Sequence, residues 1–287
     1  MPITITYTNR AIKKYNSFEE IEKDHYNLIF EINCSNNKLT SLPNNMNLPN
    51  LHTFYCHQNH LTSLPNNINF PNLHIFSCYN NQLTSLPNNM IFPNLHTFYC
   101  NNNKLTSLPN NMNLPKLQTF YCYQNKLTSL PDNMNLPKLQ TFCCDNNQLT
   151  SLRTDNGALA ELSWQNAEEL CSEELPDNMN FPNLQTFFCS HNQLKSLPDN
   201  MNFPNLQTFS CSHNQLKSLP DNMNFPNLQT FYCSYNHLTS LPVCILNFPN
   251  LKTFSCFYNQ LISLRTDNGA LFPLSGSLTR IGSKETK

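Results

Sequence analysis

The chain repeats itself every 22 residues, and this period limits its fold more than any other feature of the sequence. Written from Leu51, the unit reads L-x-x-F-x-C-x-x-N-x-L-x-x-L-P-x-x-I/M-x-F/L-P-N. It restarts at Leu73, Leu95, Leu117, Leu139, then after an interruption at Leu184, Leu206, Leu228 and, one residue late, Leu251, with a weaker first copy at Ile29. A fixed period in the range of about 20 to 50 residues indicates a solenoid, in which each coil buries its apolar side against its neighbours.

Each unit contains a five-residue segment in which apolar and polar side chains alternate, as they do in a half-buried strand. In the segment Thr53–His57, Phe54 and Cys56 should face the core, whereas Tyr55 and His57 should face the solvent. The two prolines of each unit cannot donate to a β-ladder, so they exclude a second regular strand in the same coil. We therefore expect one parallel sheet, with extended or 3₁₀ segments and little α-helix on the back of the solenoid.

Two columns of identical residues should connect neighbouring coils. The cysteines occupy the second apolar slot of each coil, and their thiols should act as small buried hydrophobes instead of forming a disulfide framework. The asparagines lie at the turn after the strand, where a carboxamide can satisfy backbone groups of its own coil and of the next. The expected structural ladder includes Cys56, Cys78, Cys100 and Cys122 together with Asn59, Asn81, Asn103 and Asn125.

This pattern resembles the leucine-rich repeat in its short form, over roughly residues 29 to 274. The many Asn and Pro residues, with Phe and Cys in leucine slots, are most similar to the leucine-rich repeat proteins of giant DNA viruses of the mimivirus type. The resemblance implies a leucine-rich repeat solenoid: a curved right-handed coil with the parallel β-sheet on its concave face and the extended or 3₁₀ segments on its convex side. It also implies that the concave strand face binds proteins.

The two ends of the chain lack the repeat. Residues 1–28 should form an N-terminal cap, since a terminal coil must hide its exposed core edge. Within them, Ser17-Phe18-Glu19-Glu20 resembles a capping box that would open a short helix to about Lys23. Residues 275–287 are rich in Ser, Gly and charge and should form a flexible tail.

The repeats fall into two blocks, six coils over 29–152 and further coils over 176–274. The interruption, 153–175, fits two structures. Its L-x-x-L-x-L spacing fits a degenerate coil that keeps the solenoid continuous, which we favour because solenoids accept insertions within a repeat. The apolar residues of 158–174 also fit helical spacing, which would make this segment a looped-out helix.

Composition argues against several classes of partner. Charged residues make up 12% of the chain, the formal net charge is -1, and no basic stripe is present. The long-range attraction to phosphate that supports binding of nucleic acids is therefore missing, and neither nucleic acid nor a membrane is an expected partner. The chain has no apolar run of about 18 residues and no apolar signal-peptide core, so we expect a cytoplasmic protein that is not secreted, in the host cytoplasm if it is viral.

The sequence contains no motif for catalysis, a cofactor or a metal. There is no nucleophile motif, no phosphate-binding loop among the 4 glycines, and no column of carboxylates. His52, His74 and His96 occupy one position of three consecutive coils, but parallel side chains seldom converge on one ion. We therefore expect no enzyme, no cofactor and no metal site.

The outward positions of the strand segments are the remaining candidate site. Tyrosines combine a large contact area with a polar tip and are enriched at binding hot spots, which predicts an unidentified protein partner. The candidate partner-binding residues are Tyr55, His57, Tyr79, Tyr99, Tyr121, Tyr123, Phe188, Tyr232, Tyr235, Phe257 and Tyr258. The alternative is a structural or self-associating array without a tuned site, because stacked Tyr and Thr also stabilise a parallel sheet by themselves.

Overall fold

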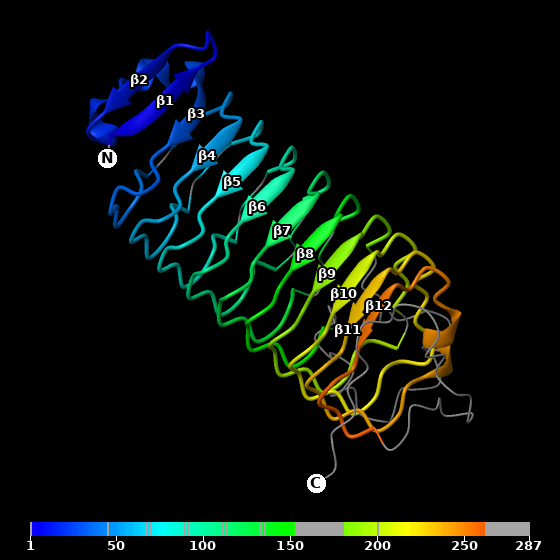
Figure 1. Ribbon diagram of the computed structural model, residues 1–287. Helices are drawn as coiled ribbons and strands as arrows, with labels where there is room; N and C mark the ends of the chain where they lie inside the picture. Colours follow the sequence, from blue (N-terminus) through cyan, green and yellow to red (C-terminus); the bar gives the residue numbers. More distant parts are fainter. Residues whose placement is uncertain are drawn as a thin grey trace, which may run out of the picture.

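The computed structural model describes residues 2–261 apart from 153–180 and residues 45, 67, 69, 89, 91, 111, 113, 132, 133, 135 and 200. The chain forms a solenoid whose strands line up side by side along one face (Figure 1). The fold class expected from the repeat is confirmed. The predictions for 153–175 and 275–287, and for the coils over 176–180 and 262–274, fall outside the described residues.

The described strands form one 12-stranded sheet in the order β12-β11-β10-β9-β8-β7-β6-β5-β4-β3-β1-β2. Its parallel part consists of β3 (Ile29–Asn33), β4 (Thr53–Tyr55), β5 (Ile75–Ser77), β6 (Thr97–Tyr99), β7 (Thr119–Tyr121), β8 (Thr141–Cys143), β9 (Thr186–Phe188), β10 (Thr208–Ser210), β11 (Thr230–Tyr232) and β12 (Thr253–Ser255). Equivalent residues of neighbouring coils pair with one another, as Phe98 does with Phe120. Phe142 of β8 pairs in the same way with Phe187 of β9, so the coil that begins at Leu184 stacks on the coil that begins at Leu139.

The N-terminal residues extend the sheet with two strands that the sequence did not predict. Strand β1 (Ile3–Tyr7) pairs antiparallel with both β3 and β2 (Ile12–Tyr15). The predicted helix is a single 3₁₀ turn, η1 (Phe18–Glu20), and does not continue to Lys23. It ends early because Ile21 adopts an extended backbone and buries its side chain in the core. A second 3₁₀ segment, η2 (Lys23–Leu28), leads into β3.

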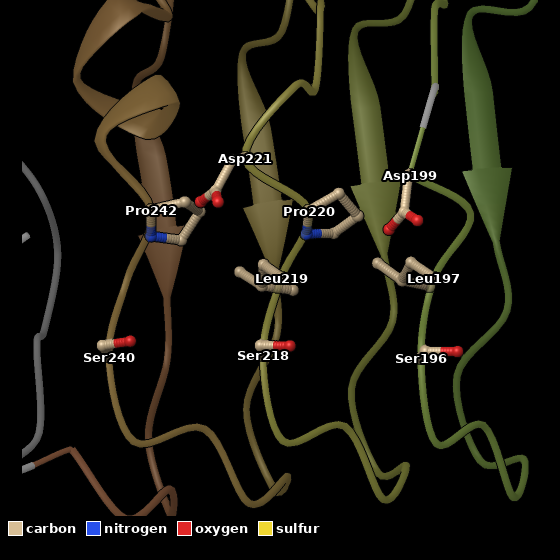
Figure 2. Close-up of a pocket in the computed structure, with 9 residues that line it drawn as sticks. All are labelled: Ser196, Leu197, Asp199, Ser218, Leu219, Pro220, Asp221, Ser240 and Pro242. Carbon is tan, nitrogen blue, oxygen red and sulfur yellow. The ribbon is translucent and has the colours of Figure 1, made fainter. Parts of the chain in front are cut away.

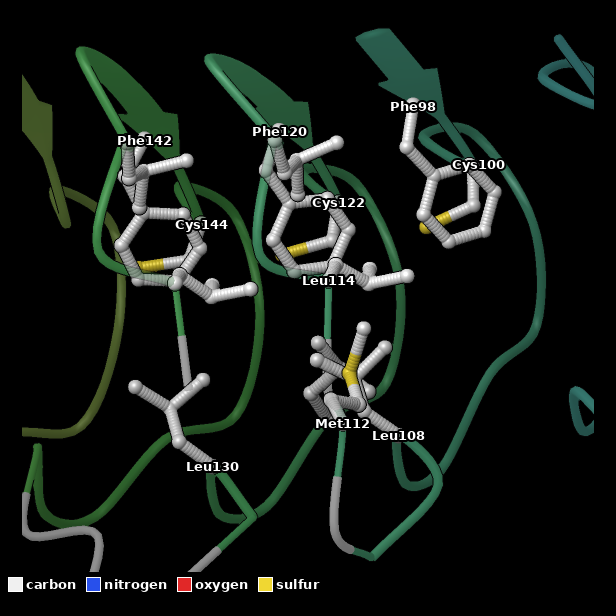
Figure 3. Packing of buried hydrophobic residues seen from close by; sticks show 14 of the residues in the cluster. Phe98, Cys100, Leu108, Met112, Leu114, Phe120, Cys122, Leu130, Phe142 and Cys144 are labelled. Carbon is white, nitrogen blue, oxygen red and sulfur yellow. The ribbon is translucent and has the colours of Figure 1, made fainter. Parts of the chain in front are cut away.

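On the back of the coils, the described residues form no named strand, as the prolines predicted. Among the described residues of the coils, only η3 (Val243–Asn247) is a helical segment there, and it is 3₁₀. Inside the coils, one phenylalanine from each strand stacks on the next, with ring centroids 5.3 to 5.6 Å apart from Phe54 to Phe254. Figure 3 shows Phe98, Phe120 and Phe142 pointing into the interior, beside the buried cysteines of the same coils.

The buried cysteines should be nearly inert in the native protein. All described cysteines are free thiols, and each of them except Cys244 is buried. Burial raises the pKa of Cys34 to about 12 and that of Cys56 well above its ordinary value. Because the thiolate is the reactive form, we expect these thiols to react with Ellman's reagent roughly 1,000-fold more slowly than free cysteine near neutral pH. In denaturant, all 13 cysteines should react.

Peptide mapping by mass spectrometry would identify which thiols are labelled in the native protein. Cys244, which is partly exposed, serves as the internal control and should be labelled before any member of the buried column. Rapid labelling of Cys100 or Cys122 without denaturant would show that the coils open readily, which contradicts the buried column.

Candidate functional site

The candidate site is the strand face, which we define by three columns of residues that follow the strands. The first outward column ends each strand and contains Tyr55, Ser77, Tyr99, Tyr121, Cys143, Phe188, Ser210, Tyr232 and Ser255. The second outward column lies two residues later and contains His57, Tyr79, Asn101, Tyr123, Asp145, Ser190, Ser212, Ser234 and Phe257. The turn column follows it directly and contains Gln58, Asn80, Asn102, Gln124, Asn146, His191, His213, Tyr235 and Tyr258. Each column runs along the solenoid because the strands are in register.

All the candidate partner-binding residues lie outside the core, but the structure separates them into groups. Tyr55, His57, Tyr79, Tyr99, Tyr121 and Tyr123 form the N-terminal aromatic cluster on β4 to β7, and each is partly exposed. In it, His57 stacks on Tyr79 with centroids 4.4 Å apart and meets the edge of Tyr55 at 5.8 Å. Tyr121 contacts Tyr99 at 5.2 Å and Tyr123 at 5.9 Å. Phe188, Tyr232 and Phe257 lie further along, in the first and second columns.

Tyr235 and Tyr258 belong instead to a stack of four rings in the turn column. His191, His213, Tyr235 and Tyr258 stack nearly parallel, with successive centroids 4.0, 4.1 and 4.3 Å apart. All four residues have a left-handed backbone, with φ between 52° and 56°. Tyr258 is 61% exposed, so this stack forms an aromatic edge of the strand face in the C-terminal half.

The histidines at the start of the strands form a second stack. Phe30, His52, His74 and His96 stack in order, with centroids 4.8, 4.0 and 4.9 Å apart. Burial, together with His74 and His96, lowers the pKa of His52. Nδ1 of His74 lies 2.8 Å from the carbonyl oxygen of Asn72, which can only accept, so Nδ1 carries the hydrogen. No group of three or more His, Cys, Asp or Glu residues in the described part of the chain could hold a metal ion.

The asparagine ladder connects each coil to the one before it. Asn125 accepts a hydrogen bond from the backbone N–H of Leu105 at 3.0 Å. Its amide group donates to the carbonyl oxygens of Cys100 at 3.1 Å, Cys122 at 3.0 Å and Tyr123 at 3.4 Å. The equivalent asparagines make the same set of contacts, for example Asn59, Asn81 and Asn103. The ladder therefore positions the outward columns without belonging to them.

Asp145 is a candidate residue that the sequence reasoning missed. It is the one carboxylate in the two outward columns of the described residues, and it lies partly buried between Tyr123 and Ser190. Its Oδ1 accepts a hydrogen bond from the backbone N–H of Ser190 at 2.7 Å. Burial raises the pKa of Asp145 to about 6, although hydrogen bonds from backbone N–H groups oppose the shift. The signal in the sequence was an acidic residue in a column otherwise filled by Ser, Asn, His and aromatic residues.

A small cavity on the back of the solenoid is the rival site. Its volume is about 220 Å³, and Figure 2 shows it as three successive coils that each contribute equivalent residues. In this view the carboxylates of Asp199 and Asp221 lie side by side with Pro220 between them, and a row of serines lies below them. Both aspartates are exposed to solvent. The cavity repeats the ordinary geometry of the coil, so it offers little contact area to a protein partner.

Comparison with known proteins agrees with this geometry. The family described as "Leucine Rich repeats (2 copies)" matches residues 93–133, 182–222 and 226–268. The chain is built of leucine-rich repeats. No curated protein matches the sequence of this leucine-rich repeat protein.

Two solved structures are similar to this leucine-rich repeat protein. YopM from Yersinia enterocolitica WA-314 is 28% identical, with a TM-score of 0.60, over 86% of this chain and 49% of YopM. InlP from Listeria monocytogenes is 24% identical, with a TM-score of 0.58, over 82% of this chain and 64% of InlP, and shows the fold alone. The chain thus spans about half the length of YopM and less than two thirds of InlP.

Proteins with leucine-rich repeats share a general function. Leucine-rich repeat proteins generally mediate protein–protein interactions, and they are typically not enzymes. In the described part of this chain, no helix has both the length and the apolar character needed to cross a membrane.

Proposed function

We propose that this leucine-rich repeat protein is a non-enzymatic interaction module that binds a protein partner on its concave strand face. The observation that carries the proposal is the N-terminal aromatic cluster, in which six rings from four consecutive strands or the turns after them are partly exposed. Ring contacts hold these side chains in two groups of three, one around His57 and one around Tyr121, so little side-chain entropy is lost when a partner packs on them. Clustered tyrosines of this kind are typical of binding hot spots.

The low charge of the strand face supports a protein partner over nucleic acid. Neither outward column contains a lysine or an arginine among the described residues, so phosphate groups find no counter-charge there. Association should proceed without strong electrostatic steering and depend only weakly on salt concentration.

We also propose that the chain is a viral protein of the Asn-rich type and contacts a host protein in the cytoplasm. The free thiols of the described cysteines favour a reducing compartment, since oxidising compartments promote disulfide formation. Fractionation of expressing cells would test the compartment, and recovery in the secretory fraction would exclude it.

Replacing two tyrosines of the cluster should remove binding without unfolding the protein. The purified chain serves as bait in cytosolic extract beside Tyr55→Ala/Tyr99→Ala, and retained proteins are identified by mass spectrometry. A partner found this way should bind the double variant at least 30-fold more weakly in calorimetry, since the loss of even one hot-spot residue costs about 2 kcal/mol or more.

The matched control is Asp199→Ala/Asp221→Ala, which changes two exposed residues of the cavity on the back. Circular dichroism should show the same sheet content for both variants, and the control should retain the partner. If both variants retain the same proteins, or the wild type retains none, the strand face is a structural or self-associating array.

A further inference from the structure

Asp145 distinguishes one place on the strand face from all others. In the adjacent first outward column, the residue of the same coil is Cys143, whose side chain is small. Cys143 pairs with Tyr121 of β7 on one side and with Phe188 of β9 on the other. In the second outward column its neighbours are Tyr123 and Ser190, because the N–H of Gln124 donates to the Asp145 carbonyl oxygen at 2.9 Å and the N–H of Ser190 to Oδ1. The carboxylate therefore lies beside Tyr123 in its own column, and Tyr121 and Phe188 occupy the adjacent column on the two strands that flank Cys143.

This carboxylate has no cationic partner in the described part of the chain, where the one ion pair joins His25 and Glu22. Its surroundings are already poorly solvated, because Asp145 is partly buried and the neighbouring Cys143 is buried. This burial raises the pKa of Asp145 to about 6. A protein that covers the strand face would remove the remaining water. An unpaired charge buried in an interface is strongly unfavourable, so a partner that supplies the opposite charge at this point binds better than one that forces the carboxyl to take up a proton.

The neighbouring rings specify which cation fits best. A guanidinium group is planar, is more weakly hydrated than an ammonium group, and stacks on aromatic faces while it donates to a carboxylate. On the β7 side of Asp145, the ring centroids of Tyr121 and Tyr123 lie 5.9 Å apart. On the other side, Phe188 ends the neighbouring strand β9. This arrangement offers aromatic walls and one acceptor group together.

We propose that Asp145, with Tyr121, Tyr123 and Phe188, forms a subsite of the strand face that binds an arginine side chain of the protein partner. The inference rests on the proposed function, since the subsite lies within the surface that would bind the partner. It assigns to the partner a chemical feature, an exposed arginine placed to reach β8.

The test uses the full chain, labelled with ¹⁵N and ¹³C, and N-acetyl-arginine methylamide as the probe. The amide signal of Ser190, which donates to Asp145, should shift and saturate with the probe. The pKa of Asp145 should fall by about one unit when the probe is bound, because a nearby positive charge stabilises the carboxylate. N-acetyl-citrulline methylamide has nearly the same shape without the charge and should cause neither change.

Asp145→Asn removes the charge and keeps the side-chain size, and it should weaken binding of the probe at least tenfold. Amide signals of the distant strands β11 and β12 report whether this variant remains folded. Failure of Ser190 to respond to the arginine probe, or an equal response to citrulline, would overturn the subsite. An equal response to N-acetyl-lysine methylamide would show that charge alone is recognised and would overturn the assignment to arginine.

The same variants separate this inference from the proposed function. If a captured partner is lost with Tyr55→Ala/Tyr99→Ala but binds Asp145→Asn with unchanged affinity, the strand face is the binding surface and the arginine subsite is refuted. Both proposals hold if Tyr55→Ala/Tyr99→Ala and Asp145→Asn each abolish binding of the partner. Charge reversal of one arginine on the partner must then abolish binding as well. If neither variant has a lower affinity for the partner than the wild type, the proposed function itself fails.

Discussion

Replacing Asn125 with alanine should lower the free energy of unfolding by about 3 kcal/mol, measured by urea denaturation. The substitution removes four hydrogen bonds at once, one accepted from Leu105 and three donated to Cys100, Cys122 and Tyr123. The carbonyl oxygens keep other partners: Asn103 also donates to Cys100, and Asn147 also donates to Cys122. The N–H of Leu105 loses its acceptor in the interior, and this unsatisfied group should account for the largest part of the effect.

Asn125→Asp makes the prediction more specific. The carboxylate can still accept from Leu105, but it would face three carbonyl oxygens with no hydrogen to donate, in a buried position. We expect Asn125→Asp to be less stable than Asn125→Ala at neutral pH, because an unpaired buried charge is added to the lost bonds. The introduced carboxyl should have a raised pKa, so the variant should regain stability as the pH falls through that pKa.

Asn72→Ala is the control for these variants. Asn72 is exposed and donates a single hydrogen bond, to the carbonyl oxygen of Pro49 at 2.8 Å. Its loss should lower the free energy of unfolding by less than about 1 kcal/mol. Equal effects at positions 72 and 125 would mean that the ladder adds nothing beyond ordinary surface hydrogen bonds.

The repeat predicted those parts of the fold in which every coil is alike. A residue that recurs every 22 positions must occupy equivalent surroundings, so Phe54, Cys56 and Asn59 together predicted the strand, its inward face and the turn. The N-terminal residues lie outside the period, and the antiparallel pairing of β1 with β3 joins segments whose spacing carries no repeat signal. For the same reason the capping-box motif predicted a helix where burial of Ile21 ends it after one 3₁₀ turn.

The left-handed turn residue was hidden because its identity varies. Asn, Gln, His and Tyr alternate in the turn column, yet Gln58, His191 and Tyr258 all have φ between 52° and 54°. Glycine or asparagine is the usual sign of this conformation, and the chain uses other residues at most of these turns. The conformation follows from the coil, which must reverse direction just before the buried asparagine.

The candidate site was predictable only in outline. Outward positions follow from the alternation of the strand, so the aromatic residues could be assigned to a face, but their contacts depend on side-chain orientations. Asp145 was missed because the comparison of equivalent positions in successive repeats identifies residues that recur, and an aspartate occurs at this position in a single coil. Its unusual properties come from burial between neighbours 22 and 45 residues away, Tyr123 and Ser190.

Replacing Phe120 with alanine should have the largest effect of any single change considered for this protein, lowering the free energy of unfolding by about 3 to 5 kcal/mol. Phe120 is fully buried, and its ring lies between those of Phe98 at 5.5 Å and Phe142 at 5.6 Å. Removing the middle ring takes away contacts on both sides and leaves a cavity in the column shown in Figure 3.

Two control variants separate the cavity from a general loss of apolar surface. Phe120→Leu refills most of the volume and should cost only about 1 to 2 kcal/mol. Phe30→Ala removes a ring that is 39% exposed, and it should cost about 1 kcal/mol or less. An effect of Phe120→Ala no larger than that of Phe30→Ala would contradict a continuous ring column.

The position of Phe120 in the middle of the array makes its effect more than local. The stability of a solenoid is approximately the sum of the low stabilities of its coils and the stabilising energies of the interfaces between them. Coils whose interfaces are weakened can therefore unfold separately from the rest. Hydrogen exchange of Phe120→Ala should therefore show β7 and β8 losing protection before β10 and β11. In the wild type, the ring column should give these four strands similar protection from hydrogen exchange. Strands β7 and β8 and the turns that follow them also hold Tyr121, Tyr123 and Asp145 in place on the strand face.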